Sequence, residues 1–227
     1  METDRRGGRI KVSPNGPYLV SGAVSLTRRA IVRSEHGEAM TWQTTARLES
    51  GVGFALCRCG GSANKPFCDG THARNGFDGS ETAASDTYDE RASTYETTRV
   101  VVRDDRTIRE HAGFCGNRLT NVWKMVRGTA ADDSVARSQM MSMIEHCPSG
   151  ALTYRMTADG EDVEPELAVE IAVTDAGPYF VTGRVQIDRA DGMPFEVRNR
   201  VTLCRCGQSK NKPLCDGSHL DAGFEGG

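Results

Sequence analysis

The sequence lacks long apolar runs and an excess of basic charge. Its 227 residues contain no apolar stretch close to the roughly 18 residues that a membrane-spanning helix needs. The opening run, METDRRGGRIKV, is charged and has no apolar segment of the kind that marks a secretory signal. The formal net charge of −3 argues against a nucleic-acid-binding protein. We therefore expect a cytoplasmic protein that binds neither membranes nor nucleic acid.

The sequence also lacks the short motifs of common enzyme classes. It contains no glycine-rich nucleotide fingerprint, no G-x-S-x-G nucleophile turn and no H-E-x-x-H zinc motif. These absences predict a non-enzymatic protein, although they leave oxidoreductase activity of a bound redox centre open.

Cysteine, by contrast, is plentiful, and most of it lies in an internal repeat. Eight cysteines in a chain without a secretory signal are more typical of metal ligands or catalytic thiols than of disulfides. Residues 10–24, IKVSPNGPYLVSGAV, match residues 171–185, IAVTDAGPYFVTGRV, and residues 56–77 match residues 203–224. The two offsets, 161 and 147, differ by 14 residues. This difference predicts an inserted loop in the first copy, within RSEHGEAMTWQTTARLESGVG.

The repeat predicts two copies of one small module around a different domain. Each copy has β-branched runs interrupted by glycine, which indicate short strands, and a segment rich in Gly, Pro and Asn, which indicates a loop. Residues 81–93 are polar and predict a linker. We place the first module at residues 1–85, the middle domain at 86–157 and the second module at 158–227.

Each module carries the spacing Cys-x-Cys-x8-Cys-x3-His, which uses six of the eight cysteines and two of the five histidines. Zinc is held tetrahedrally by such ligands, usually with a C-x2–4-C bracket. The tighter C-x-C bracket suits two thiolates on one iron of a [2Fe–2S] cluster, with the later cysteine and histidine on the second iron. The spacing favours iron–sulfur and leaves zinc open. The candidate cofactor and metal ligands are Cys57, Cys59, Cys68, His72, Cys204, Cys206, Cys215 and His219.

The residues between these ligands resemble the CDGSH iron–sulfur domain of the mitoNEET type. The matching segments are CRCG…NKPFCDGTH and CRCG…NKPLCDGSH, together with the upstream GPYLVSG and GPYFVTG. Only Thr71 departs from the CDGSH letters, and it keeps the hydroxyl. The resemblance implies one [2Fe–2S] cluster in each module, held by three cysteines and one histidine. It also implies that the two modules pair inside one chain with approximate two-fold symmetry, which predicts a monomer with an internal pseudo-dimer.

The histidine ligand has predictable consequences. A neutral imidazole in place of a thiolate makes the cluster less negative and raises its reduction potential. The ring nitrogen that is not bound to iron can exchange a proton, so that electron uptake is expected to depend on pH and acid to loosen the cluster. Asp69 and Asp216 are expected to cap a short helix or to hold the loop. The nearby cations either offset cluster charge or are solvated loop residues: Arg58, Lys65, Arg205, Lys210 and Lys212.

The middle domain has helical patterns at residues 118–126 and 133–147 and a strand pattern at residues 97–105. The runs REHAGFCGNRL and EHCPSGALTY resemble divergent mono-cluster ferredoxin domains. The resemblance places four cluster positions at Arg109, Ala112, Cys115 and Cys147, so that two ligands are missing. We expect no stably bound third cluster and a ferredoxin-like fold kept as a spacer or docking domain. The alternative is that Cys115 and Cys147 lie close together as a redox-active pair or labile metal site.

Together these observations predict an α+β iron–sulfur protein with two small β-rich modules, each of strands, a cluster loop and a short helix, around a ferredoxin-like domain. It would bind two [2Fe–2S] clusters and act in one-electron transfer or in cluster transfer. Its partner would be a redox protein or an apo-protein that accepts clusters. The alternative is a zinc-stabilised structural or interaction protein with two Cys3His sites.

Overall fold

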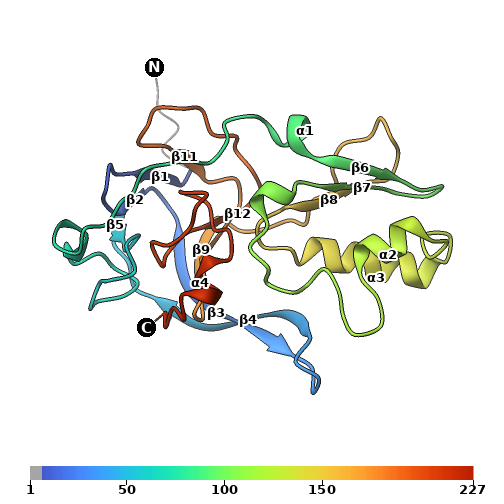
Figure 1. Cartoon of the computed structure of the whole chain (residues 1–227), viewed down its shortest axis with the longest axis horizontal. Coiled ribbons are helices and arrows are strands. Elements are labelled where there is room, and N and C mark those ends of the chain that lie inside the picture. Colours follow the sequence, from blue (N-terminus) through green and yellow to red (C-terminus); the bar gives the residue numbers. More distant parts are fainter. Residues whose placement is uncertain (1–6, 227) are drawn as a thin grey trace. The chain divides into compact units, whose positions relative to one another are not determined.

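The computed structural model describes residues 7–226, which form two compact units (Figure 1). Unit 1 comprises the described residues up to Ala30, then Thr44–Ser85 and the residues from Leu167 on. Unit 2 comprises Ile31–Gln43 and Asp86–Glu166. Both copies of the repeat therefore belong mainly to unit 1, and the middle of the chain forms most of unit 2. The predicted boundaries at residues 85/86 and 157/158 stay a prediction.

The two sheets of unit 1 exchange strands between the copies. One sheet has the order β11-β1-β2-β5, in which β11 comes from the second copy. The other has the order β12-β10-β9-β3-β4, in which β3 and β4 come from the first copy. The strands are β1 (Arg9–Val12), β2 (Tyr18–Ser21), β3 (Ser25–Arg33), β4 (Ala39–Leu48), β5 (Gly53–Leu56), β9 (Glu170–Thr174), β10 (Tyr179–Thr182), β11 (Gln186–Asp188) and β12 (Arg200–Leu203).

The exchange is reciprocal. Strand β1 pairs in parallel with β11, with Ile10 opposite Ile187, and β9 pairs in parallel with β3, with Ile171 opposite Leu26. In the repeat, β1 corresponds to β9 and β3 to β11, so each copy lends its third strand to the other copy's sheet. The other pairs within these sheets include antiparallel β1–β2, β2–β5, β9–β10 and β10–β12. The predicted pseudo-two-fold arrangement of strands is therefore present within unit 1.

Two glycines make the crossover possible. Gly22 follows β2 with a φ of +87°, and Gly183 follows β10 with a φ of +78°. Residues with a side chain rarely adopt this backbone conformation. A Cβ atom on Gly22 would lie 2.7 Å from the carbonyl oxygen of Gly7, and one on Gly183 would lie 2.6 Å from the amide nitrogen of Val169. Glycine is needed here both for the turn and for the close approach of another backbone.

The core of unit 1 lies where the two sheets meet. Strands β1 and β2 alternate buried and exposed residues, whereas β9, β10 and β12 are buried at every position. Tyr18 of β2 and Tyr179 of β10 meet edge to face, with ring centroids 6.0 Å apart. Both side chains are fully buried, so the equivalent tyrosines of the two copies lie at the centre of the packing.

The predicted inserted loop is instead a β-hairpin. Strand β3 is nine residues long and β4 is ten residues long. Residues 31–43, which comprise the end of β3, the turn and the start of β4, belong to unit 2. The prediction of a loop was wrong because the insertion contains three threonines and a tryptophan, which suit an extended hairpin, and its turn lies only at residues 34–38. His36, in that turn, is exposed.

Unit 2 contains an antiparallel sheet, β6-β7-β8, packed against two helices. The helices confirm the two helical patterns of the sequence, and Met140 of the second helix is fully buried in the core. Residues 81–93 were wrongly predicted to be only a linker, because a capping box between Thr87 and Glu90 starts a short helix there. The elements are α1 (Tyr88–Arg91), β6 (Ser93–Glu96), β7 (Val101–Asp104), η2 (Arg106–Ile108), α2 (Val122–Arg127), α3 (Ser134–Glu145) and β8 (Leu152–Arg155).

The remaining helices of unit 1 are one turn long: η1 (Thr71–Ala73) and α4 (Ser218–Asp221), each at the end of a CDGSH-like segment. Among residues 7–226, no helix combines the length and the apolar character needed to cross a membrane.

Candidate metal centres

The same backbone bridge builds both Cys-His loops. In the first, Leu56 pairs with Phe67, while the amide of Cys57 donates to Pro66 O at 2.8 Å and that of Cys68 to Ala55 O at 2.9 Å. In such a pairing neighbouring residues point to opposite faces, so both cysteines lie on the face away from Leu56 and Phe67. The second loop repeats this bridge, with Leu203 paired to Leu214. The amide of Cys204 donates to Pro213 O and that of Cys215 to Thr202 O, both at 2.9 Å.

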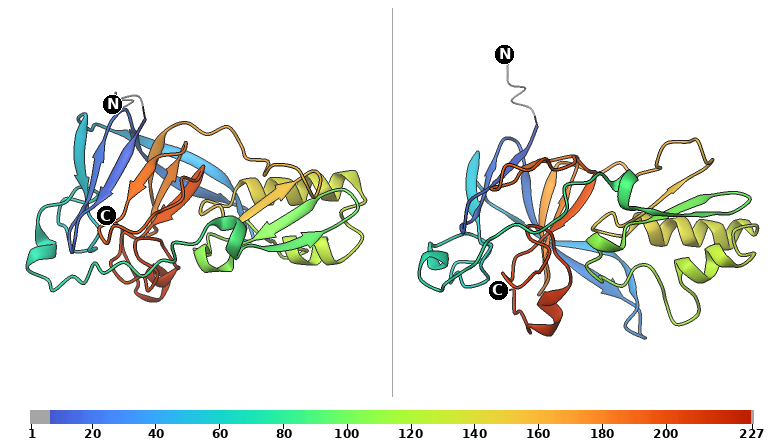
Figure 2. Two further views of the ribbon diagram at one scale, coloured as in Figure 1. Left: turned by 90° about the horizontal axis from the view of Figure 1, so that it is seen from above. Right: turned by 45° about the horizontal axis from the view of Figure 1, so that its top comes forward.

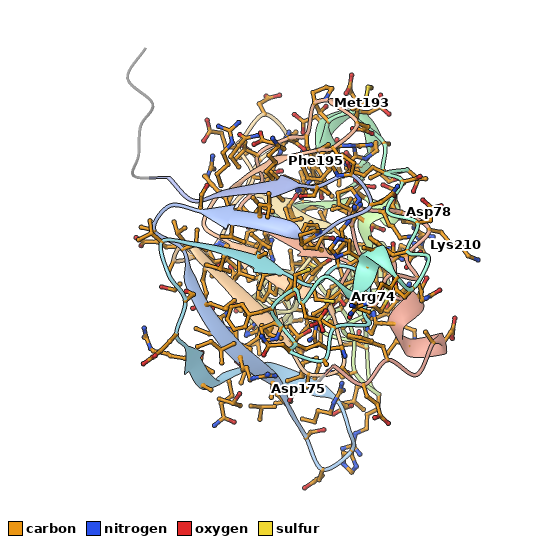
Figure 3. The ribbon with its side chains drawn as sticks, turned by 90° about the vertical axis from the view of Figure 1, so that its left-hand side faces the viewer. Arg74, Asp78, Asp175, Met193, Phe195 and Lys210 are labelled. Carbon is orange, nitrogen blue, oxygen red and sulfur yellow. The ribbon has the colours of Figure 1, made fainter. Side chains whose placement is uncertain are left out.

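The two loops lie at the same end of the unit 1 strands. Figure 2 shows both beyond the strand ends, and Figure 3 labels Arg74 just after η1 and Lys210 within the second loop, both on that side. Met193 and Phe195 lie apart from them, in the connection between β11 and β12. The strand exchange therefore brings the two candidate centres to one end of one unit.

The donors of each loop are arranged two and two. In the first loop, the sulfur atoms of Cys57 and Cys59 are 3.9 Å apart, and Cys68 Sγ lies 3.4 Å from Nδ1 of His72. In the second loop, the corresponding distances are 3.8 Å for Cys204 and Cys206, and 3.4 Å for Cys215 and His219. The predicted donors are thus brought together in the same pattern twice, with Nδ1 of each imidazole turned toward a thiol.

This pattern suits a group that contains two metal ions. A tetrahedral zinc site needs all four donors around one ion, whereas a [2Fe–2S] cluster takes two protein donors on each iron. The donor set of three thiols and an imidazole, arranged as two pairs, fits an iron–sulfur cluster in each loop.

The thiols of the second bracket do not titrate alike. The hydrogen bond with Cys204 lowers the pKa of Cys206 to about 7, and an amide hydrogen bond from Gln208 acts in the same direction. The partner thiol, Cys204, has its pKa raised well above 9 by that same hydrogen bond and by burial. A thiolate is the metal-binding form of cysteine, and the hydrogen bond between the two sulfur atoms means that the first ionisation belongs to this pair as a whole.

Backbone amides support the sulfur atoms, a feature that spacing did not reveal. The amides of Gly61, Gly70 and Gln208 each donate to a ligand sulfur at 3.4 Å, those of Cys59, Cys68 and Cys206 respectively. Hydrogen bonds to cluster sulfur atoms stabilise negative charge and raise the reduction potential. The signal for them was a glycine one or two residues after each of these three cysteines, which permits the tight turn.

The aspartates hold the loops rather than cap the short helices. Asp69 accepts from the amides of Ala63 at 2.9 Å and Thr71 at 3.0 Å, and Asp216 accepts from the amides of Lys210 at 2.8 Å and Ser218 at 3.0 Å. The N-cap positions are the left-handed glycines that follow, without a side-chain cap. Of the two predicted roles for Asp69 and Asp216, the structure has the second, because each carboxylate ties the two ends of the donor loop together.

The arginines inside the brackets are buried, not solvated. Arg58 and Arg205 are each 1% exposed. Arg205 donates to the carbonyl oxygens of Gly177 at 2.9 Å, Thr174 at 2.8 Å and Gly226 at 2.7 Å, and its guanidinium lies 5.6 Å from the ring centroid of Tyr179. The middle residue of each C-x-C bracket is therefore a buried cation that donates to backbone carbonyls and is not solvated.

Arg58 lies beside a buried carboxylate. Its guanidinium donates to Gly79 O at 2.8 Å and lies 4.0 Å from the buried carboxylate of Glu81. The lysines have a lesser role: Lys65 and Lys212 donate to loop carbonyls at 2.7 Å, and Lys210 is exposed.

Each copy also stabilises the loop of the other through its buried tyrosine. The hydroxyl of Tyr18 donates to Cys204 O at 2.8 Å and lies 3.1 Å from Pro213 O. In return the hydroxyl of Tyr179 lies 2.9 Å from Cys57 O and 3.0 Å from Pro66 O. Sequence reasoning missed both contacts, because they join residues more than 110 positions apart.

In unit 2, the two remaining cysteines line one cavity of about 200 Å3. Of the other two cluster positions, Ala112 offers no side-chain donor, and Arg109 is bound to the carboxylate of Asp104, with its guanidinium 4.4 Å from the ring of Trp123. A [4Fe–4S] cluster needs four ligands, so the side chains present do not fit one. The expectation that Cys115 and Cys147 share one site agrees with their common cavity.

The histidine that follows α3 is used elsewhere. His146 stacks on Phe114, with ring centroids 5.6 Å apart, and its Nδ1 lies 2.7 Å from Ser142 O. Phe114 in turn contacts Trp42 from the inserted hairpin, at 5.1 Å between ring centroids. The tryptophan of the insertion therefore packs beside the loop that carries Cys115.

Comparison with known families agrees with these sites. Residues 15–73 and 176–220 match the family described as iron-binding zinc finger CDGSH type, and residues 95–157 match the divergent 4Fe-4S mono-cluster family. A search of curated proteins gave no match, and neither did a search of solved structures. The chain is an iron–sulfur protein in which two CDGSH-type iron-binding domains flank a divergent 4Fe-4S mono-cluster domain.

Proposed function

We propose that each Cys3His loop binds one [2Fe–2S] cluster, and that the protein carries single electrons or delivers its clusters to apo-proteins rather than acting as an enzyme. The observation that carries this proposal is the arrangement of donors in two pairs, which recurs at 3.9 and 3.4 Å in one loop and 3.8 and 3.4 Å in the other. A bound [2Fe–2S] cluster supplies a one-electron couple.

The protein residues set the charge around each centre. Three thiolates and one neutral imidazole carry one negative charge fewer than four thiolates, and the buried arginine of each bracket offsets a further charge. With Nδ1 turned toward the neighbouring thiol, Nε2 of His72 and of His219 remains to hold or release a proton. This supports an electron uptake that depends on pH, and it gives each centre one donor that acid can detach.

The cofactor assignment is tested by counting iron and sulfide in the purified chain and recording EPR spectra after reduction. We expect about four iron and four acid-labile sulfide ions per chain, with visible absorption and the signal of a reduced [2Fe–2S] cluster. A colourless protein that contains about two zinc ions would contradict the proposal and favour the zinc-stabilised structural alternative.

Replacing both histidine donors by cysteine tests the ligand set. In the double variant His72→Cys, His219→Cys, the additional thiolate charge should lower the reduction potential, and the loss of the imidazole proton should flatten its pH dependence. The clusters should also survive lower pH. Potentials are measured by dye-coupled titration at several pH values, with His36→Ala as the control, because His36 is exposed in the β3–β4 turn. An unchanged reduction potential in the double variant would contradict the assignment of His72 and His219 as ligands.

A kinetic comparison separates electron transfer from cluster transfer. An apo-ferredoxin, incubated with the holoprotein, reports transfer through the growth of its own cluster signal, while a flavin-dependent reductase reports electron uptake through bleaching. If the protein is a cluster carrier, the apo-ferredoxin should gain its cluster faster from the holoprotein than from an equal amount of free iron and sulfide. An electron carrier should instead cycle through reduction and oxidation many times without losing iron.

A further inference from the structure

The cavity of unit 2 contains chemistry that the two Cys-His centres do not use. It holds about 200 Å3 and is lined by the loop of residues 109–115, by Trp123 of α2 and by the segment that follows α3. Two cysteines face it, Cys115 from the loop and Cys147 from the segment after α3. Both are half-buried thiols, neither sealed in the core nor open on the surface.

Both cysteines are positioned by the backbone. The carbonyl of Cys115 accepts from the amide of Val122 at 3.0 Å, where α2 begins, and the amide of Cys147 donates to Ile144 O at 3.0 Å, where α3 ends. The two side chains pack against one hydrophobic core. The pKa of Cys115 is raised by burial and by the charge of Cys147, so Cys147 lies close enough to affect the ionisation of Cys115.

A buried carboxyl group shares this cavity. Glu110 is 5% exposed, and burial raises its pKa to about 7, although the amide of Ala112 donates a hydrogen bond to it. The other charged or titratable groups that line the cavity are Arg109, His111 and the two thiols. Of these, Arg109 forms an ion pair with Asp104. A carboxyl that titrates near neutrality is suited to take a proton from a thiol that burial keeps protonated.

We propose that Cys115 and Cys147 form a reversible dithiol–disulfide couple, with Glu110 as the group that receives the thiol proton. The partner is a disulfide of a small thiol or of an exposed protein loop. One thiolate attacks this disulfide, forms a mixed disulfide and releases one thiol. The second thiolate then displaces the other half, so that one intramolecular disulfide and two reduced thiols result, and the two protons pass to the released thiolates. The reverse reaction restores the dithiol.

The side chains of the cavity favour this couple over a [4Fe–4S] cluster. Two thiols are half of the ligands that a [4Fe–4S] cluster needs, and the position of Arg109 is occupied by its ion pair with Asp104. A dithiol needs only the two sulfur atoms that are present. With two ligand positions missing, the redox chemistry of this domain changes from the one-electron couple of a cluster to the two-electron couple of a disulfide.

The test uses the full-length holoprotein in glutathione buffers of graded redox potential. After acid quench, alkylation and peptide mass spectrometry count the reduced fraction of each cysteine. We expect Cys115 and Cys147 to lose alkylation together, to appear as one linked peptide pair, and to recover with dithiothreitol. Cys115→Ser and Cys147→Ser should each leave the other cysteine as a mixed disulfide with glutathione, and thermal unfolding verifies that these variants are folded.

Glu110→Gln tests the proton acceptor. Its exchange rate should be severalfold slower at neutral pH and should rise less steeply between pH 6 and 8 than that of the natural protein. Thiols that stay fully alkylated in every buffer would overturn the proposal, and so would extra iron that disappears in Cys115→Ser. The visible spectrum reports the Cys-His centres separately, so its loss would count against the proposed function and not against the dithiol.

Discussion

At the scale of single residues, the carboxylates next to the donors matter through hydrogen bonds and not through metal binding. Asp69 joins the amides of Ala63 and Thr71, and the hydrogen bond from Ala63 is the main reason that its pKa lies well below the usual range. For Asp216, burial acts to raise the pKa, but hydrogen bonds from Ser218 and Lys210 outweigh it and lower the pKa.

Removing either carboxylate should shorten the lifetime of the cluster in its own loop. We expect Asp69→Ala and Asp216→Ala to lose visible absorbance faster than the natural protein at pH 6, with Asp159→Ala, an exposed residue of unit 2, as the control. Because these pKa values are lowered on folding, the stabilisation is present above the unfolded pKa and is lost as the pH falls through the folded one. Equal lifetimes in all variants would contradict the loop-holding role.

Glu110 should make stability depend on pH in the opposite direction. A carboxyl whose pKa is raised on folding, from 4.5 to about 7, binds more protons in the native state, so stability falls as the pH rises through this interval. A shift of this size corresponds to a free energy on the order of 3 kcal/mol. Glu110→Gln should therefore unfold at a higher temperature than the natural protein at pH 8 but not at pH 4. Calorimetry at both pH values measures this, and parallel curves would show that Glu110 ionises normally.

At the scale of secondary-structure elements, the exchange of β3 and β11 links the two modules, and the tyrosines on β2 and β10 lie at the centre of this link. Tyr18 contacts the loop of Cys204, and Tyr179 contacts the loop of Cys57. Each hydroxyl is buried and satisfies a carbonyl of a donor residue. Removing one leaves a buried acceptor without that partner, at a cost of about 1–3 kcal/mol.

The contacts between copies predict an effect that crosses from one module to the other. Tyr18→Phe should speed alkylation of Cys204 during acid-induced cluster loss, while Cys57 reacts at its normal rate. Tyr179→Phe should do the reverse, so each variant serves as the control for the other. Peptide mass spectrometry at timed intervals follows both thiols in one sample. A larger effect on the loop of the same copy would show that the contacts of Tyr18 and Tyr179 do not govern cluster retention.

At the scale of the whole molecule, neither module has a complete sheet of its own. Without the first copy, β9 lacks its parallel neighbour β3, and β11 lacks β1. Unpaired strand edges favour association with another chain. A second copy of the same module can supply the missing strands, because the exchange is reciprocal.

A fragment of residues 158–227 should therefore not persist as a folded monomer. We expect it to form a dimer in which two second modules exchange β11, measured by light scattering after size-exclusion chromatography. The full chain, whose two modules already pair, should be a monomer under the same conditions. A monomeric fragment with cooperative thermal unfolding would show that the exchanged strands are dispensable.

The sequence predicted the donors more completely than the fold. The spacing from Cys57 to His72 is local, and each donor loop is closed by a bridge between residues 11 positions apart, so the residue order alone places the four donors near one another. The helices of unit 2 were also predictable, because their buried residues recur with the helical period. The inserted hairpin was not, since its strands were mistaken for a loop.

The sequence by itself determined the chemistry of this protein: two sets of three thiols and an imidazole, and a middle domain with two of four cluster ligands. Only the tertiary structure decided that the copies exchange strands, that Tyr18 and Tyr179 hold each other's donor loops, and that Cys115 and Cys147 share a cavity with Glu110. The physical reason is sequence separation. The spacing of the donors is set within one short segment of each copy. Strand exchange instead depends on pairing and burial between residues more than 140 positions apart, which no local pattern specifies.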